Sequence, residues 1–228
     1  RPYNVTTDIV ATDIYPIGYP PGNHSLLPNK EISMVGDYTR QMKLLASPGM
    51  SVWMTLQIAW SGVIKPGKTL RLPTLPEQRF MTYQAIINGA RGLLYFGGHI
   101  PKAMSDEDAR LGWNWRHWRR VLRPVIEEIG EKSPLYPALL APESARPIKT
   151  PEAGRIEFCA RETGSALFLL ACSRGNETAL VTFSGLPDGE REAEVMFEPP
   201  RTVAVRNGTL QDWFAPFEVH VYRLSQDR

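Results

Sequence analysis

The first half of the chain alternates between short, continuous apolar runs and longer segments in which apolar residues recur every three or four positions. The apolar runs resemble strands that are buried on both faces of a parallel sheet. The first run ends at Asp13, the second spans 52–56 and the third spans 92–96. Each run precedes a segment of helical periodicity, at 33–46, 74–88 and 112–130. The pattern predicts three successive strand–helix units, which fit either a doubly wound sheet or part of a barrel.

Local signals mark two of the expected helices. Thr74 and Glu77 stand at the spacing of a capping box, and Pro76 is tolerated in a first helical turn. This spacing favours a structural role for Glu77 over a catalytic one. Pro124 lies inside the third helical segment, where its missing N–H is expected to kink or restart the helix.

After Pro134 the pattern changes to short alternating runs separated by turn signals such as "RNGT". The expected strands are "RIEFCARE", "ALFLLACS", "TALVTFSG", "EAEVMFE", "RTVAVRNG" and "FEVHVYRL". His220, in the last run, is expected to alternate outward. The sequence therefore predicts an α/β fold over 1–136, followed by an all-β domain, a small antiparallel β-sandwich, over 137–228.

The two cysteines are expected to stay unpaired. A hairpin that turns at Thr163–Gly164 sets Cys159 opposite Phe168, which leaves Cys172 about 13 Å further along at roughly 3.3 Å per residue. A disulfide requires Cα atoms within about 7 Å of each other. Both thiols should therefore be free and mostly buried.

Composition and charge narrow the classes of partner. The 228 residues carry 26 basic and 24 acidic side chains, and this balance argues against nucleic acid or a membrane as partner. No apolar run is long enough to span a bilayer. No pair among the four histidines has the spacing of a zinc site, and no glycine-rich phosphate loop follows a strand. We expect neither a metal nor a cofactor.

Polar and aromatic side chains gather where the predicted parallel strands end. Such positions lie together at the carboxyl edge of a sheet, where a barrel enzyme holds its substrate. Aromatic faces stack on the CH face of a sugar ring, and carboxylates or carboxamides bond its hydroxyl groups. The candidate site residues are Asp13, Tyr15, Gln57, Trp60, Tyr95 and His99.

Three segments then carry a family resemblance. "DIVATDIYPIG", "SVWMTLQIAW" and "PTLPEQRFMTYQAIINGARGLLYFGG" resemble the last three strands of (β/α)8-barrel glycoside hydrolases of the clan-A type. The resemblance implies units six to eight of a TIM-type barrel, a small β domain after them, and a poly- or oligosaccharide substrate. It also implies a partner, because the N-terminal half of the barrel has to come from the same protein or from a separate chain. An extracellular or periplasmic location is expected.

The resemblance also raises a question about Gln57. In that retaining clan the nucleophile is a glutamate at the end of the seventh strand, at or near the position of Gln57, and the acid/base residue lies on the fourth strand, outside this chain. A carboxamide cannot attack an anomeric carbon, so Asp13 becomes the best catalytic candidate. Two alternatives stay open: an active hydrolase, or an inactive barrel that binds glycans or serves as a scaffold. Each of these positions also has a purely structural interpretation. Asp13 would cap a turn, Gln57 would bond a buried backbone group, and Tyr95 would belong to the core.

Overall fold

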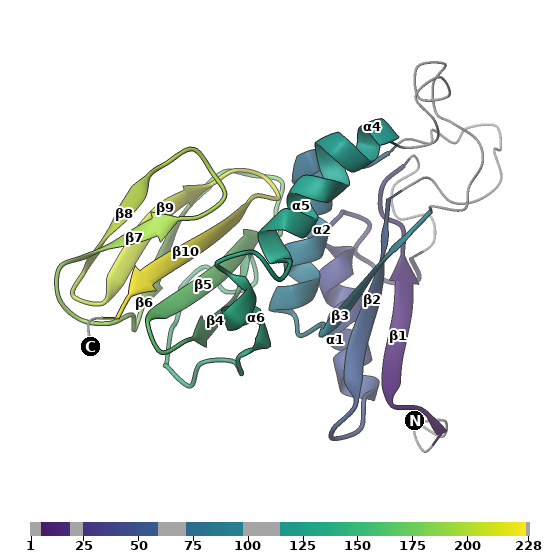
Figure 1. Cartoon of the computed structure of the whole chain (residues 1–228), viewed down its shortest axis with the longest axis horizontal. Coiled ribbons are helices and arrows are strands. Elements are labelled where there is room, and N and C mark those ends of the chain that lie inside the picture. The colour runs from purple at the N-terminus through teal and green to yellow at the C-terminus, as the bar shows by residue number, and fades with distance from the viewer. Residues whose placement is uncertain (1–5, 19–24, 59–71, 98–114, 227–228) are drawn as a thin grey trace. The chain divides into compact units, whose positions relative to one another are not determined.

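The computed structural model describes residues 6–18, 25–58, 72–97 and 115–226, and the chain divides into two compact units, 1–126 and 127–228 (Figure 1). Among the described residues, no helix combines the length and the hydropathy that a membrane span requires. Each unit has a sheet and a hydrophobic core of its own.

A parallel sheet of three strands, in the order β1–β2–β3, organises the described part of the first unit. Its strands are β1 (Ile9–Ile14), β2 (Ser51–Gln57) and β3 (Gly92–Phe96). The register places Asp13 beside Thr55, and Thr55 beside Leu94. Three of the predicted strands therefore lie in one parallel sheet, and its extension into a barrel stays a prediction.

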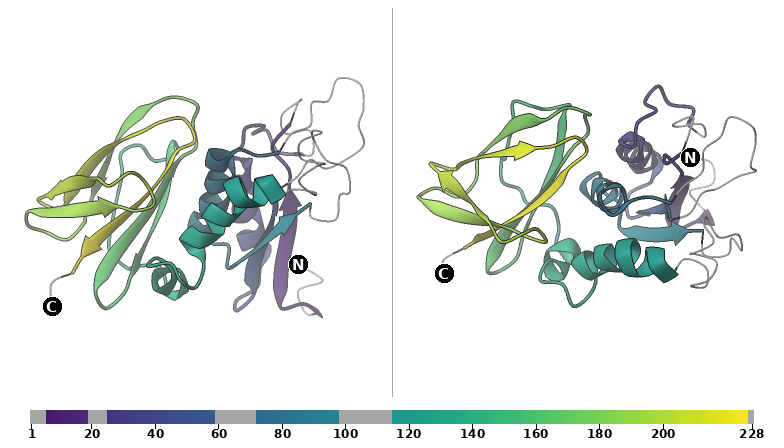
Figure 2. Two further views of the ribbon diagram at one scale, coloured as in Figure 1. Left: turned by 45° about the horizontal axis from the view of Figure 1, so that its top comes forward. Right: turned by 90° about the horizontal axis from the view of Figure 1, so that it is seen from above.

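One face of this sheet is covered by α1 (Met34–Leu45) and α2 (Leu75–Ile87), which lie side by side along it (Figure 2). Met54 and Leu56 of β2 point into the resulting core and have no exposed surface. The two helices approach closely at Gly36, where a Cβ would lie 2.8 Å from the side chain of Gln84. Gln84 uses this proximity, because its Oε1 accepts a hydrogen bond from the Gly36 N–H at 3.0 Å.

The opposite face of the sheet carries apolar side chains that remain accessible. Ile9, Leu94 and Phe96 are 39%, 46% and 36% exposed. On β2, the indole of Trp53 lies over Gly92, where a Cβ would come within 2.5 Å of the ring. In the described structure one face of β1 and of β3 is therefore exposed, and their burial on both faces stays a prediction that depends on the rest of the barrel.

A further helical stretch consists of α4 (Trp115–His117), the π-helical η2 (Trp118–Leu122) and α5 (Arg123–Ile129). The Arg123 N–H bonds the Trp118 carbonyl, five residues back, directly before Pro124. Because Pro124 has no N–H for the regular ladder, a wider turn at this point accommodates it without ending the helix. The short α6 (Tyr136–Leu140) follows.

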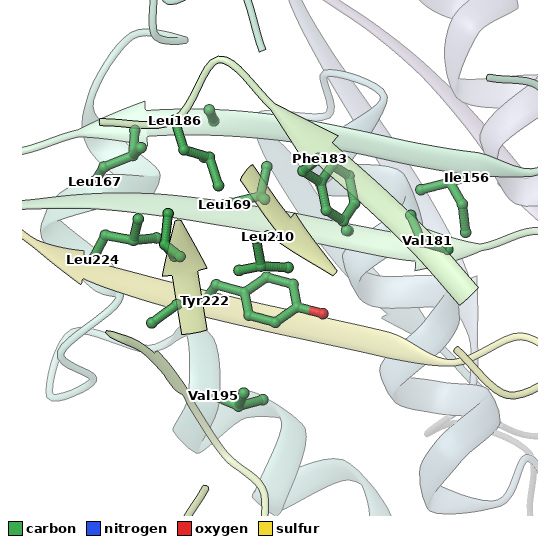
Figure 3. Packing of buried hydrophobic residues seen from close by; sticks show 14 of the residues in the cluster. Ile156, Leu167, Leu169, Val181, Phe183, Leu186, Val195, Leu210, Tyr222 and Leu224 are labelled. Carbon is green, nitrogen blue, oxygen red and sulfur yellow. The ribbon is translucent and has the colours of Figure 1, made fainter. Parts of the chain in front are cut away.

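The second unit is a seven-stranded antiparallel sheet in the order β4–β5–β10–β7–β8–β9–β6, which confirms the predicted antiparallel β domain. Pairing links all of the strands into one sheet, and side chains from opposite parts of it meet in a single core (Figure 3). The strands are β4 (Ile156–Glu162), β5 (Ala166–Ser173), β6 (Ala179–Ser184), β7 (Arg191–Val195), β8 (Thr202–Arg206), β9 (Thr209–Phe214) and β10 (Val219–Ser225).

Turns fix the register of this sheet. Asn207 and Gly208 join β8 to β9 with φ values of 48° and 68°, as a two-residue hairpin requires. In the first hairpin Cys159 lies opposite Leu170 and not opposite Phe168, because the turn lies at Gly164–Ser165, one residue further along the chain than the sequence suggested. Both cysteines are nevertheless free and buried, as predicted.

Both edges of the seven-stranded sheet are engaged by segments outside the named strands. At the β6 edge, Lys149 and Ser184 exchange two backbone hydrogen bonds of 2.9 Å. At the β4 edge, the Ser144 N–H donates to the Ala160 carbonyl at 2.7 Å, and Glu143 forms a bridge to Arg161.

Candidate functional site

Asp13, Tyr15 and Phe96 come together where β1 and β3 end. Asp13 is exposed, on the face of the sheet that α1 and α2 leave uncovered. The Tyr15 side chain forms a hydrogen bond with Asp13, and its ring meets Phe96 edge-on, with centroids 5.6 Å apart. Burial, this hydrogen bond and the charge of Asp13 raise the pKa of Tyr15. The phenol therefore stays protonated and donates to the carboxylate, which it holds in one orientation.

Gln57 ends β2 for a reason that is visible in its contacts. Its Oε1 accepts a hydrogen bond from the Ile17 N–H at 2.9 Å, and its Nε2 donates to the Ile17 carbonyl at 3.0 Å. The side chain is 1% exposed. The carboxamide thus bonds both backbone groups of Ile17, as a neighbouring strand would, and holds the segment that follows β1 in place. Its role as a substrate ligand stays a prediction.

The structure places Tyr95 on the other face of the sheet from Asp13. Its hydroxyl lies 3.0 Å from Thr82 Oγ1 of α2, and burial raises its pKa to about 12. Side chains alternate along β3, so Phe96 occupies the face that carries Asp13. Sequence reasoning missed Phe96, although its position relative to Tyr95 in the strand was the available signal.

Two further candidates, Trp60 and His99, lie outside the described residues. Within the ranges that the structure describes, no group of three or more His, Cys, Asp or Glu side chains could hold a metal ion.

The first turn of α2 contains the predicted capping box and a buried carboxamide beside it. Thr74 and Glu77 bond each other's backbone N–H groups, which gives Glu77 the structural role expected of it. The carboxamide of Gln78 has no exposed surface, and neither of its polar atoms has a hydrogen-bond partner in the described structure. Sequence reasoning did not identify this buried group.

A second set of ionisable side chains lies in the antiparallel unit, around His220. This residue is 2% exposed, which corrects the prediction that it points outward. Its Nδ1 lies 2.6 Å from Glu198 Oε1, and its Nε2 lies 3.4 Å from Glu218 Oε2. Burial alone would lower the pKa of His220, but the hydrogen bonds and charges of the two glutamates outweigh it and raise the pKa to about 9.

Arg201 extends this set toward β9 and β10. Its Nη1 lies 2.8 Å from Asp212 Oδ2, and its Nη2 lies 3.2 Å from Glu198 Oε2. The Tyr222 hydroxyl donates to Asp212 at 2.9 Å, and burial together with the charge of Asp212 raises the pKa of Tyr222. Each buried charge thus has a partner of opposite sign, which offsets the cost of its burial.

A scan against protein-family models and a search of curated proteins found no match for the chain. Solved structures do match it. An Anoxybacillus alpha-amylase aligns with a TM-score of 0.54 and 14% identity over 86% of this chain and 45% of the amylase. An alpha-amylase from Geobacillus thermoleovorans, solved with acarbose, aligns with a TM-score of 0.53 and 14% identity over 85% of this chain and 42% of the amylase.

A third structure, of a protein from Bacillus halodurans proposed to be an alpha-N-acetylgalactosaminidase, gives a TM-score of 0.52 at 11% identity. The alignment covers 86% of this chain and 42% of the Bacillus halodurans protein. The chain therefore spans less than half the length of these three proteins. At these identities the likeness is one of fold.

Proposed function

We propose that the chain is the C-terminal portion of a glycoside hydrolase that acts on a poly- or oligosaccharide. Its parallel strands would then complete a (β/α)8 barrel. The observation that carries the proposal is the exposed Asp13 carboxylate, which Tyr15 orients beside the ring of Phe96 where the strands end. The shared fold with parts of alpha-amylases supports it.

Glycoside hydrolysis commonly requires two carboxyl groups. Asp13 would provide one of them, as acid, base or nucleophile, and the part of the barrel outside this chain would provide the other. Tyr15 would act as a positioning residue, because its hydroxyl bonds the Asp13 carboxylate. The Phe96 ring would offer an apolar surface to the sugar.

The proposal also explains the exposed apolar face of the sheet. Ile9, Leu94 and Phe96 lie on that face, and in a closed barrel such positions point into the packed interior. The partner that covers them would be the remaining barrel units, carried by the same protein or by a separate chain.

The test is hydrolysis of a panel of aryl glycosides by the complete protein. Asp13→Asn keeps the shape and removes the charge, so we expect turnover to fall by about 10²–10⁴-fold, as for the loss of a general acid or base. Asp8→Asn is the matched control, because Asp8 is exposed just before the opposite end of β1, and its activity should match that of the unaltered protein. Full activity in Asp13→Asn would exclude this residue from the mechanism.

The second candidate function is an inactive barrel that binds glycans or serves as a scaffold. Gln57 favours this candidate, because it stands at or near the position where the resembled clan carries its nucleophile. Both polar atoms of its carboxamide are hydrogen-bonded to the backbone of Ile17. Binding of an oligosaccharide by the complete protein, without turnover of any aryl glycoside, would support this candidate over the hydrolase.

A further inference from the structure

A cavity of about 580 Å³ lies in the antiparallel unit, beside the hairpin that joins β7 to β8. This volume falls within the range of small-molecule sites, roughly 300–1,000 Å³. Its lining combines apolar surface with polar groups, chiefly from Met196, Phe197, Pro200, Glu198, Arg201 and Thr202. None of the residues proposed for the barrel site contributes to it.

Phe197 is held at this cavity in a backbone conformation that bulky residues avoid. Its φ is 64°, in the left-handed region, where a side chain with a Cβ is strained. Backbone bonds of the two preceding residues anchor it: the Val195 N–H donates to the Arg201 carbonyl across the turn at 3.1 Å, and the Met196 N–H donates to the Val221 carbonyl at 2.8 Å. The hairpin therefore keeps an aromatic ring in the cavity wall against a local preference.

The charged groups of the wall are already paired. Glu198 bonds both His220 and Arg201, and Arg201 also bonds Asp212. At the rim, Glu194 lies 3.4 Å from Arg223. The wall thus offers fixed donors and acceptors with little uncompensated charge. An anionic ligand would meet Glu194 and Glu198, and a cationic one would meet Arg201, so the arrangement favours a neutral ligand that is rich in hydroxyl groups.

We propose that this cavity is a saccharide-binding site, separate from the carboxyl edge of the parallel sheet. The Phe197 ring would lie against the CH face of a neutral sugar, while Glu198, Arg201 and Thr202 would bond its hydroxyl groups. The geometry resembles that of small-molecule sites, in which an apolar surface provides contact area and a few fixed polar groups orient the ligand.

The decisive variant is Phe197→Gly. Glycine adopts a φ of 64° without strain, so the fold should be kept or stabilised while the ring is lost. The complete protein is run in native gels that contain amylopectin, arabinoxylan or galactomannan, and its mobility is compared with that in a gel without polymer. We expect retardation by at least one of these neutral polymers, and about fivefold weaker affinity in Phe197→Gly, the order expected for one aromatic contact.

Trp213→Ala is the matched control. Trp213 is 61% exposed and does not line the cavity, so its loss should leave the retardation unchanged. Three results would overturn the proposal: no retardation by any of the three polymers, loss of retardation in Trp213→Ala with Phe197→Gly unaffected, or retardation only by the acidic polymer polygalacturonate. Because the readout is binding, it does not depend on whether Asp13 supports hydrolysis.

Discussion

The carboxamide of Gln57 gives and receives one hydrogen bond with the same backbone unit, that of Ile17. Gln57→Glu would replace the donating NH₂ by an oxygen that faces the Ile17 carbonyl. In a site with 1% exposure, we expect a loss of about 1–3 kcal/mol in the free energy of unfolding. Urea denaturation of the complete protein at neutral pH measures it.

The same change at Gln211, which is exposed on β9, provides the comparison, and it should alter stability by less than about 0.5 kcal/mol. Equal effects at both positions would mean that the bonds to Ile17 contribute little.

Single residues also show what strand-end reasoning can and cannot find. Asp13 and Tyr15 could be located because a buried run breaks at a polar residue, and the structure brings both to one place. Tyr95 was grouped with them because it, too, lies near a strand end. Successive side chains of a strand point to opposite faces of the sheet, so Tyr95 contacts Thr82 while Phe96 contacts Tyr15. This alternation determines which of two neighbouring residues can reach the site.

Turn chemistry made one hairpin of the antiparallel sheet predictable, whereas a buried charge concealed one of its strands. The Asn207–Gly208 turn was identifiable because its residues tolerate left-handed φ. The strand that follows it, β9, was missed because Asp212 and Gln211 interrupt the apolar alternation. Asp212 can occupy a mostly buried position there only because Arg201 and Tyr222 bond it, and those partners are distant in sequence.

Gly208 provides a test of this turn. Its φ is 68°, and a Cβ there would lie 2.7 Å from the Leu186 carbonyl oxygen, which is a backbone atom. We expect Gly208→Ala to lower the free energy of unfolding by about 1–3 kcal/mol, because strain and a clash act together. Thermal unfolding of the complete protein, followed by circular dichroism, measures the change. Gly164→Ala is the control, since a Cβ at that turn meets nothing within 4 Å, and a similar loss there would contradict the explanation.

The stability of the protein should depend on pH through His220. Its pKa in the folded state, about 9, lies above the ordinary value of 6.5. The folded protein therefore binds this proton more tightly, so the contribution is fully present below pH 6.5 and is lost as the pH rises to about 9. We expect the melting temperature to fall across this interval.

His220→Gln should flatten that dependence while lowering stability at pH 6, because Glu198 and Glu218 would lose a cationic partner. At acid pH a second decline is expected, since hydrogen bonds with His220 lower the pKa of Glu218. A melting temperature that stays constant between pH 6.5 and 9 would contradict the assignment of the charge to His220.

The exposed face of the parallel sheet should govern how the 228-residue chain behaves by itself. Ile9, Leu94 and Phe96 place apolar side chains on one surface, and such surfaces favour association. We expect the isolated chain to sediment as an oligomer or aggregate and to bind a hydrophobic dye. Leu94→Lys should reduce both signals, whereas Leu180→Lys, an exposed leucine of β6, should not. A monomer with a cooperative melt would contradict the barrel proposal.

The covered edges of the seven-stranded sheet decide what form that association can take. Lys149 occupies the backbone groups of Ser184 on one side, and Ser144 occupies the carbonyl of Ala160 on the other. A free edge is the template on which another chain could extend a sheet indefinitely, as in fibrils. With both templates engaged in this way, clustering of the chain should proceed through side-chain contact at the three-stranded sheet and stay amorphous and reversible. An amyloid-type fibre growing from the antiparallel unit would first require the segments around Ser144 and Lys149 to detach.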